Sequence, residues 1–431
     1  MTMSPNAFLN RQTLSLRPDP ARVVLRPFRP ATEPRELSPV DCARANHIVD
    51  RVLGLDPATV EHQLAEVLEN FLGRHRNLVA TFEARTHAME YVFPHVALTG
   101  TQRQLIGAYF LHEYSFEAAA LFNPSIVAHP DQSGVASAEH RFILSLRAVG
   151  EGHVSSLTFR SGRISADGTV TVDETARLAS IPNVLQSDGE SHADSVELAF
   201  SPDEHISERV IFPITAAHAN GIEDARFVRF TDAGRTTFYA TYTAYSGTAI
   251  RSELLETSDF VSFRLKALKG PAARNKGMAL FPRKVNGHYA MIGRQDNENL
   301  YLIYSDDLHS WGEGVLCLQP LYPWEFVQIG NCGSPIELDE GWLLFTHGVG
   351  AMRRYCIGAA LLDKSDPSRV LARSSEPLLG PQLSEREGYV PNVVYTCGAM
   401  RHHDQIILPY AVSDSYSNFA TLQISALLGA M

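Results

Sequence analysis

The sequence contains no long apolar run. None of its 431 residues belongs to a stretch of about 18 consecutive apolar residues, the length that a membrane-spanning helix requires. Residues 1–11 also lack the apolar core of a secretory signal peptide. We therefore expect a cytoplasmic protein that has no membrane partner.

Cysteine is scarce, and its pattern excludes two common uses. The five cysteines are odd in number, widely spaced and free of C-x-x-C pairs: Cys42, Cys317, Cys332, Cys356 and Cys397. A disulfide framework or a structural zinc site would require pairs at short spacing. The cysteines are predicted to be reduced thiols.

Positive charge is in deficit. Lys and Arg number 37 against 48 Asp and Glu, so the net charge is -11 at pH 7. This balance predicts no basic face for nucleic acid. Any anionic ligand must be held by a local cluster of Arg, Lys or His. The 45% hydrophobic and 20% charged content is typical of a soluble globular protein.

The first 118 residues are predicted to form an extended arm followed by helices. Residues 1 to 35 are rich in Pro and Arg, which favours an extended chain. Apolar residues at helical spacing then predict helices from Ser38 to Leu53, from Asp56 to Phe71 and from Leu105 to Phe116. Their apolar stripes must be covered, either by the rest of the chain or by a second copy in a homo-oligomer.

Residues 119–431 change to short strand-like runs bounded by Gly, Asp, Asn and Pro, which predicts an all-β domain. Residues 255–263 and 303–311 share a strand, then Ser-Asp, then an aromatic residue, with Ser258 and Ser305 47 residues apart. Residues 198–203 are a weaker copy. A repeat of roughly 40–60 residues with about four strands indicates propeller blades. We therefore predict a five-bladed β-propeller with an N-terminal helical extension.

The hexapeptide Gly221-Ile222-Glu223-Asp224-Ala225-Arg226 precedes a strongly strand-like run at residues 237–245. Two adjacent acids and an arginine are too polar for a core, so we expect them to project into the central cavity. Asp224 is the first candidate for catalysis. The alternative is an acidic turn in which Asp caps its own backbone.

Five motifs resemble, in order, the signature of glycoside hydrolase family 130. They are the hexapeptide with residues 242–245, Arg274-Asn275-Lys276-Gly277 with the strand after it, residues 324–335, residues 341–348 and residues 388–395. The family consists of five-bladed β-propeller β-mannoside phosphorylases and a smaller group of β-1,2-mannosidases. The resemblance runs from about Asn123 to Asp414.

The resemblance implies an inverting phosphorolysis, in which inorganic phosphate is the nucleophile and co-substrate and no other cofactor is used. It assigns Asp224 as the general acid, acting through the O3 hydroxyl of the mannosyl unit. Glu223 is assigned a supporting role and, in an extended segment, would point to the other face.

For the sugar, the resemblance implies Asn123, Arg147, Asn275 and Asp414. For Asn123, Arg147 and Asp414 the ordinary alternatives are a turn, a solvated strand end and a cap. For phosphate, it implies Arg274, Arg294 and His347, since arginine meets two phosphate oxygens at once. A buried core histidine is the alternative for His347. Gln328 stands where many relatives have Lys, which removes one positive charge.

Two other functions stay open. An inverting mannosidase would need a second carboxylate to activate water, and Glu325 is the candidate. A non-catalytic propeller that only binds glycans would need aromatic platforms and no acid paired with an anion cluster. The linkage is also open between β-1,2 and β-1,4, and the helical extension favours β-1,2.

Overall fold

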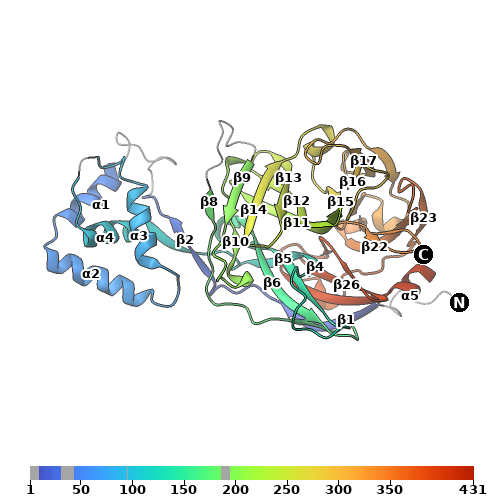
Figure 1. Ribbon diagram of the computed structural model, residues 1–431, viewed down its shortest axis with the longest axis horizontal. Coiled ribbons are helices and arrows are strands. Elements are labelled where there is room, and N and C mark those ends of the chain that lie inside the picture. Colours follow the sequence, from blue (N-terminus) through green and yellow to red (C-terminus); the bar gives the residue numbers. More distant parts are fainter. Residues whose placement is uncertain (1–8, 31–42, 95, 186–194) are drawn as a thin grey trace. The chain divides into compact units, whose positions relative to one another are not determined.

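The computed structural model describes residues 9–30, 43–94, 96–185 and 195–431 (Figure 1). By their contacts, these residues form two units, which are described separately below. A helical unit spans residues 20–116 together with 177–180, and a β unit comprises the rest. No helix among the described residues is long and apolar enough to span a membrane.

The helical unit holds four helices and one strand pair: α1 (Ala43–Leu53), α2 (Pro57–Asn70), α3 (Leu78–His87), α4 (Gly100–Tyr109), β2 (Val23–Pro27) and β3 (Leu111–Ser115). Local sequence sets the helix starts. Asp56 accepts from the amide of Thr59 ahead of Pro57, and Thr99 forms a capping box with Gln102. The buried faces of α1, α2 and α4 form one apolar core.

The sequence predicted these helices in part. The helix from Asp56 is confirmed, whereas the predicted start at Ser38 lies outside the described residues and α3 was not predicted. The predicted helix from Leu105 to Phe116 is confirmed as far as Tyr109 and wrong beyond it, because α4 ends there and the chain continues as β3. There it pairs with β2, where Val23 faces Ser115. Tertiary pairing overrides the local helical pattern at this point.

The β unit is predominantly β, and its described strands form five antiparallel meanders. Meander 1 contains β4 (Ala120–Ala128), β5 (His140–Val149) and β6 (Ser155–Ile164), with β7 (Val170–Val172) and β10 (Val210–Ile211) beside β6. Meander 2 contains β11 (Gly221–Asp232), β12 (Arg235–Tyr245), β13 (Ile250–Thr257) and β14 (Ser262–Ala267), followed outward by β9 (Ser195–Ala199) and β8 (Asn183–Leu185). One parallel pair, Gly221 with Ser155, joins these two meanders.

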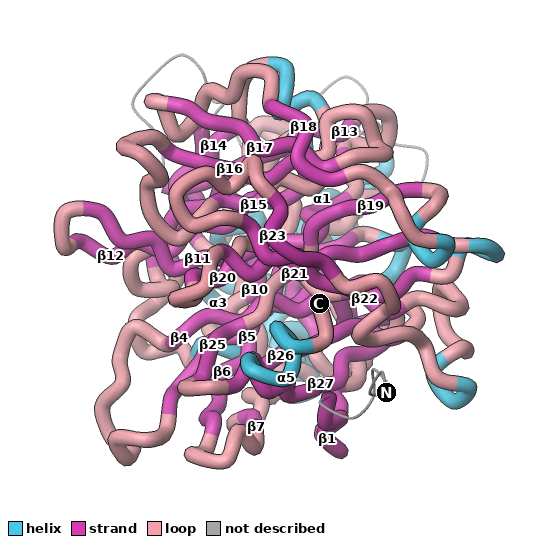
Figure 2. The backbone as a smooth tube through the Cα atoms, turned by 90° about the vertical axis from the view of Figure 1, so that its right-hand side faces the viewer, coloured by secondary structure: helices cyan, strands magenta, loops and turns pink. Residues whose placement is uncertain are grey.

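The other three meanders follow in chain order. Meander 3 contains β15 (Ala279–Leu280), β16 (Tyr289–Gly293), β17 (Leu300–Ser305) and β18 (Val315–Leu318). Meander 4 contains β19 (Gln328–Asn331), β20 (Ile336–Glu337), β21 (Trp342–Val349), β22 (Tyr355–Leu362) and β23 (Val370–Arg373). Meander 5 contains β24 (Val394–Tyr395), β25 (Met400–His402), β26 (Gln405–Val412) and β27 (Tyr416–Gln423). The short helix α5 (Ile424–Gly429) continues from β27 (Figure 2).

Meander 5 is completed by the first described strand of the chain. Strand β1 (Leu9–Leu16) pairs antiparallel with β27, with Leu9 opposite Leu422. The predicted first domain of residues 1–118 therefore includes a strand that belongs with the β unit. Composition gave no sign of this, because the pairing joins residues about 400 positions apart in the chain.

The predicted repeat occupies equivalent positions in two meanders. Residues 258–261 connect the third and fourth strands of meander 2, and residues 306–314 do the same in meander 3. Asp259 and Asp307 each accept backbone amides of their own turn. The weaker copy at residues 198–203 instead follows β9, a strand added outside β14.

Candidate active site

One cavity of about 390 Å³ draws residues from all five meanders of the β unit. It is lined by Asn123, Arg147, Glu223, Asp224, Lys276, Arg294, Asn297, Gln328, His347, Arg353, Tyr355, Val390, Val393, Tyr395 and Asp414. Seven of the nine predicted site residues are in this set. Arg274 and Asn275 are not.

Backbone irregularities turn two of these side chains into the cavity. The pairing of β4 with β5 shifts register at Asn123, and that of β11 with β12 shifts at Asp224. Both residues are left-handed, with φ of 49° and 54°. Asn and Asp tolerate this conformation better than other residues with a Cβ. Strands β4 and β11 are the first strands of meanders 1 and 2, so a bulge with a positive φ recurs at the same place in both meanders.

The bulge also corrects the prediction for Glu223. In a regular strand, Glu223 and Asp224 would point to opposite faces. Because Asp224 is left-handed, the alternation breaks and both carboxylates line the cavity. Arg147 Nη2 donates to Glu223 Oε1 at 2.7 Å.

Asp224 is held by three neighbours. Asn123 Nδ2 donates to its Oδ1 at 2.6 Å, and Arg147 Nη1 donates to the same oxygen at 3.4 Å. Arg226 Nη1 donates to the Asp224 carbonyl at 3.0 Å and its Nη2 to the Tyr395 hydroxyl at 2.8 Å. The side chain of Asp224 is 15% exposed, which leaves one edge open to a ligand.

The site drives the pKa values of two carboxyls apart. Burial raises the pKa of Asp414 to about 6, and the negative charge of Asp224 adds to the effect. Burial would also raise the pKa of Asp224, but the charges of Arg147, Arg226 and Lys276 outweigh it, so that pKa lies below its usual value. At a pH between these two pKa values, Asp414 therefore holds a proton and Asp224 does not.

A group of cations lies in the same cavity. Among the described residues, Arg294, Lys276 and Arg353 have no carboxylate within ion-pair distance. Arg294 is 9% exposed and its Nε lacks a hydrogen-bond partner. A buried guanidinium without a counter-ion is costly, and an anionic ligand would relieve that cost.

His347 enters the cavity from β21. Its Nε2 lies 3.4 Å from Arg294 Nη1, which can only donate, so Nε2 accepts. Burial, reinforced by the charge of Arg294, sets the pKa of His347 well below its usual value, so the ring is neutral. Its edge packs on Gly330, where an added Cβ would lie 2.2 Å from His347 Cε1.

The structure places Lys276, not Arg274, in the cavity. Arg274 ends a short 3-10 helix and is exposed. Asn275 does not line the cavity either, and its Oδ1 accepts the amide of Lys276 at 2.8 Å while its carbonyl accepts from Ser252. Lys276 stood inside the quoted motif, but which of its residues reaches the cavity depends on the backbone turn.

Glu325 lies outside the cavity. It is fully buried, and its Oε1 accepts from the amides of Leu321 and Tyr322 and from Arg373 Nη2. These contacts cap the 3-10 helix Pro323–Glu325. A carboxylate fixed in this way cannot activate a water at the cavity, so Glu325 is not a catalytic base in this structure. Gln328 does line the cavity.

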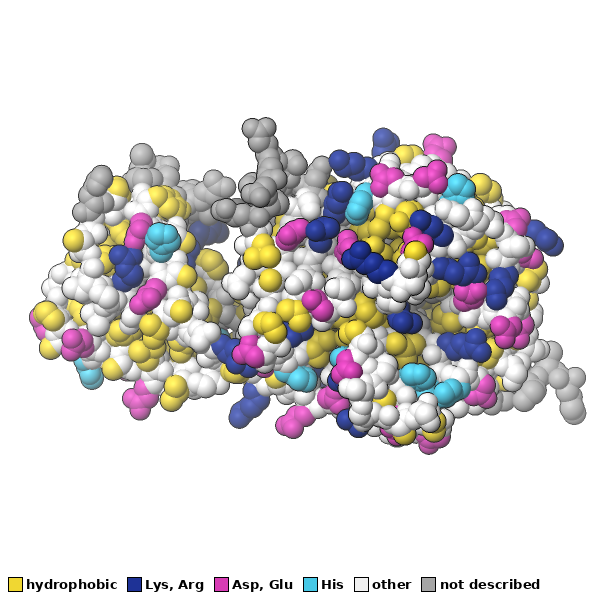
Figure 3. All heavy atoms as spheres, in the orientation of Figure 1, with side chains coloured by type: hydrophobic (Ala, Val, Ile, Leu, Met, Phe, Trp, Pro, Cys, Tyr) yellow, Lys and Arg dark blue, Asp and Glu magenta, His cyan; other side chains and the backbone are white. Residues whose placement is uncertain are grey.

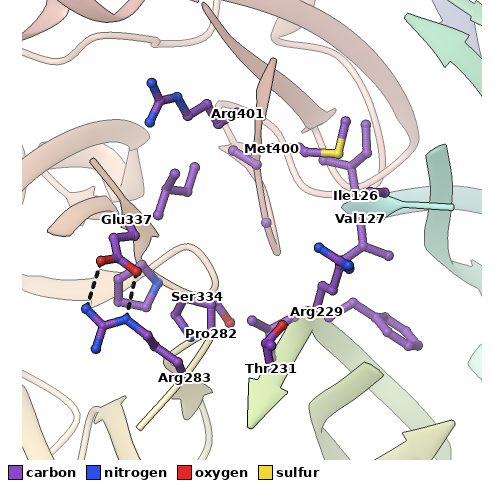
Figure 4. Close-up of a pocket in the computed structure, with 17 residues that line it drawn as sticks. Ile126, Val127, Arg229, Thr231, Pro282, Arg283, Ser334, Glu337, Met400 and Arg401 are labelled. Atoms are coloured by element: carbon purple, nitrogen blue, oxygen red, sulfur yellow. Dashed lines mark hydrogen bonds and ion pairs between the residues drawn. The ribbon is translucent and has the colours of Figure 1, made fainter. Parts of the chain in front are cut away.

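A second cavity of about 490 Å³ is lined by the ends of β4 and β11, which follow Asn123 and Asp224 in the chain (Figure 4). Residues 282–283, 334–337 and 398–401 complete its lining. Its acidic lining residue, Glu337, is paired with Arg283 through two contacts of 2.7 and 2.8 Å. The remaining lining is largely aliphatic or basic, and includes Ile126, Val127, Arg229 and Met400. It offers no free carboxylate for acid catalysis.

On the face seen in Figure 3, Lys and Arg side chains alternate with Asp and Glu over the β unit, and no patch of one sign dominates. Such a surface lacks the continuous basic stripe with which proteins follow a nucleic-acid backbone.

Comparison with known proteins gives concordant results. A family model described as beta-1,4-mannooligosaccharide phosphorylase matches residues 196–431. The 1,2-beta-oligomannan phosphorylase of Thermoanaerobacter sp. is 34% identical over 218 residues, which are 49% of this chain and 71% of that protein. The beta-1,2-mannobiose phosphorylase of Listeria innocua is 31% identical over 245 residues, 54% of this chain and 67% of that protein.

Among solved structures, the Listeria innocua beta-1,2-mannobiose phosphorylase in complex with beta-1,2-mannobiose aligns with a TM-score of 0.53. The alignment covers 72% of this chain and 92% of that chain, at 23% identity. At this identity the likeness supports the fold alone.

Proposed function

This chain belongs to glycoside hydrolase family 130, and on that premise we propose that it catalyses the inverting phosphorolysis of β-1,2-linked mannosides. The products are α-D-mannose 1-phosphate and a shortened sugar. One observation carries the proposal: a single cavity contains the carboxylate of Asp224 beside buried Arg294 and half-buried Lys276. Neither cation has a carboxylate within ion-pair distance in the part of the chain that the structure describes.

The architecture that supports this chemistry is proposed to be a five-bladed β-propeller. Each meander is one blade, and each contributes residues to the catalytic cavity. Strand β1 closes the wheel by completing the blade formed by β24 to β27. Closure by a strand from the other end of the chain removes an open sheet edge.

In the proposed reaction, a phosphate oxygen attacks the anomeric carbon of the terminal mannosyl unit while the glycosidic bond breaks. The departing oxygen takes a proton from the O3 hydroxyl of that unit, and Asp224 replaces the proton on O3. Arg294, Lys276 and neutral His347 would hold the phosphate, and Asn123, Arg147 and Asp414 the sugar. Phosphate is the co-substrate, and no other cofactor takes part.

Asp224 must carry a proton before it can act as an acid. The nearby charges of Arg147, Arg226 and Lys276 lower its pKa and so favour the ionised form. Phosphate brings negative charge into the cavity and neutralises Arg294 and Lys276. Both effects raise the pKa of Asp224 toward the range that a general acid requires. Binding of phosphate therefore favours the protonated form of Asp224, which is the form that acts as the acid.

The β-1,2 linkage is proposed from the relatives, since two of those matched over about half of this chain are named for β-1,2-mannosides. The family model carries a β-1,4 description. Synthesis reactions with α-mannose 1-phosphate and mannose, followed by identification of the product linkage, decide between them. A β-1,4 product would overturn the linkage and leave the phosphorolysis intact.

The test of the reaction is its need for phosphate. Incubation of the protein with β-1,2-mannobiose should yield α-mannose 1-phosphate with phosphate present and no sugar product without it. Free mannose released at the same rate without phosphate would show a hydrolase. Binding of the disaccharide with no product in either condition would show a glycan-binding module.

A further inference from the structure

Three histidines gather where meander 1 meets meander 5, outside the catalytic cavity. His140 begins β5, His402 ends β25, and His403 lies in the turn to β26. The same seam is held by backbone hydrogen bonds from Leu121 to Ser415 and from Cys397 to Pro124, of 3.0 and 2.8 Å. Residues about 260 positions apart thus meet at the closure of the β unit.

The three imidazoles are packed as metal ligands are. One ring nitrogen of each lies within 4.8 Å of the others, and His140 Nδ1 is 2.9 Å from His402 Nδ1. The ring centroids are separated by 4.4 to 5.4 Å. Two nitrogens bound to one ion at about 2.0–2.1 Å each would lie roughly 3 Å apart, so the observed separation needs little adjustment.

In His402 and His403, hydrogen bonds to backbone carbonyls show which ring nitrogen carries the hydrogen. His402 Nε2 lies 2.9 Å from the Ser165 carbonyl, and His403 Nε2 lies 3.0 Å from the Ala138 carbonyl. A carbonyl only accepts, so each Nε2 carries the hydrogen and Nδ1 of each neutral ring keeps its lone pair. His402 Nδ1 accepts from His140 Nδ1 at 2.9 Å, and a bound ion would take the place of that hydrogen. A backbone carbonyl behind the ring is the usual partner of a metal-binding histidine.

The site is also accessible. His402 is buried, His140 is half-buried and His403 is exposed, so an ion could enter from solvent and retain water in its remaining positions. A purely imidazole donor set suits zinc, copper, nickel or cobalt, whereas calcium and magnesium require oxygen ligands.

We propose that His140, His402 and His403 bind one divalent late first-row metal ion of the zinc class. The ion would link β5 to the turn between β25 and β26 and fasten the seam between the first and last meanders. This site is separate from the catalytic residues, and the proposal does not depend on the assigned reaction.

Titration calorimetry of the full-length protein with zinc chloride tests the proposal, with magnesium and calcium chloride as comparisons. We expect one zinc ion per chain, a rise in the thermal unfolding midpoint, and neither effect with magnesium or calcium. His403→Ala and His140→Gln should each weaken zinc binding at least tenfold and remove the thermal shift. His288→Ala, a partly exposed histidine paired with Asp306, is the matched control and should change neither.

His403 is exposed, so its variant should fold, and phosphorolysis by that variant should equal that of the parent protein. Zinc binding of equal strength in the parent, His403→Ala and His140→Gln would overturn the proposal. No saturable binding by the parent would overturn it as well, and would leave the cluster as a hydrogen-bonded histidine group.

Discussion

At the residue scale, the site depends on two backbone positions with a positive φ, a conformation that few residue types adopt readily. Asn123 and Asp224 each sit at a bulge, and the first donates to the second. The hydrogen bond exists because both bulges turn toward one cavity. Function here follows from a local departure from regular strand geometry.

Asp224→Asn tests the acid without disturbing this geometry, since Asn adopts a positive φ readily and its oxygen can still accept from Asn123. We expect the fold and sugar binding to persist and turnover to fall by roughly 10² to 10⁴, the contribution of a positioned general acid. The measurement is kcat for phosphorolysis. Turnover within about threefold of the parent would remove Asp224 from the mechanism.

The proposed phosphate site is tested by a pair of neighbouring variants. Lys276→Ala removes a cation that lines the cavity, whereas Arg274→Ala removes an exposed cation two residues away. A hydrogen bond to a charged group contributes about 1.5–3 kcal/mol, so Lys276→Ala should raise KM for phosphate roughly ten- to two-hundred-fold. Arg274→Ala should change it little. The reverse result would restore Arg274 to the phosphate site, as the sequence predicted.

Asp414 gives the residue-scale pH prediction. Its pKa is raised from 3.8 to about 6 in the folded protein, so the folded state holds this proton more tightly than the unfolded state. As pH rises from 4 to 6, the unfolded chain loses the proton first. The free energy of unfolding therefore falls over this range and levels off above pH 6. The fall is about 3 kcal/mol at most, since one pKa unit corresponds to about 1.4 kcal/mol.

Asp414→Asn should therefore raise the free energy of unfolding relative to the parent, and the gain should be larger at pH 7 than at pH 4. Urea unfolding at both pH values measures it, and the exposed Asp339→Asn is the control. Asp224 does not interfere in this window, because its lowered pKa affects stability only as pH falls below about 4. A gain independent of pH would contradict the raised pKa.

At the element scale, β1 is held by more than its ladder. Arg11 Nη1 donates to both oxygens of Glu385, at 2.9 Å each, and its Nη2 donates to the Gly380 carbonyl. Glu385 is buried, and it also accepts from the Tyr410 hydroxyl and the Gln382 amide. The strand thus supplies a pairing edge for β27 and also an ion-pair partner for a buried acid in the 3-10 helix Leu383–Glu385, between β23 and β24.

Arg11→Ala should lower the free energy of unfolding by about 3–5 kcal/mol, the cost of leaving a buried charge without its partner. Arg17→Ala, which removes a cation over the Tyr416 ring, is the matched control and should cost about 0.5–1 kcal/mol. Chemical denaturation gives both values. If Arg11→Ala in a Glu385→Gln background costs as much as it does alone, the ion pair is not the cause.

At the scale of the whole molecule, the helical unit contributes no residue to the catalytic cavity as described. Its chain enters and leaves at adjacent positions, because Val23 faces Ser115 in the β2–β3 pair. It also exposes large apolar side chains, including Leu72 and Tyr91 at 81% and 51%. These features suit a unit that associates with a second copy of the chain.

Replacing residues 23–115 with a short Gly/Ser loop should therefore retain phosphorolysis and reduce solubility or the oligomeric mass. Unlike a deletion of residues 1–118, this change keeps β1 in place. Light scattering and activity are the measurements. A soluble product with the parent's oligomeric state would contradict the docking role of the helices.

The sequence predicted the strand content and most of the residues that line the cavity, because short-range patterns and ordered motifs carry that information. Its assignment of Asp224 as the general acid stays a prediction. The repeat that it predicted from the Ser-Asp pattern falls at equivalent turns of two meanders. Tertiary structure alone decided four points: β1 joins the last meander, α4 gives way to β3, Glu223 faces the cavity and Lys276 replaces Arg274 there. Each depends on pairing between distant residues or on a single backbone φ, and neither leaves a periodic signal in the chain.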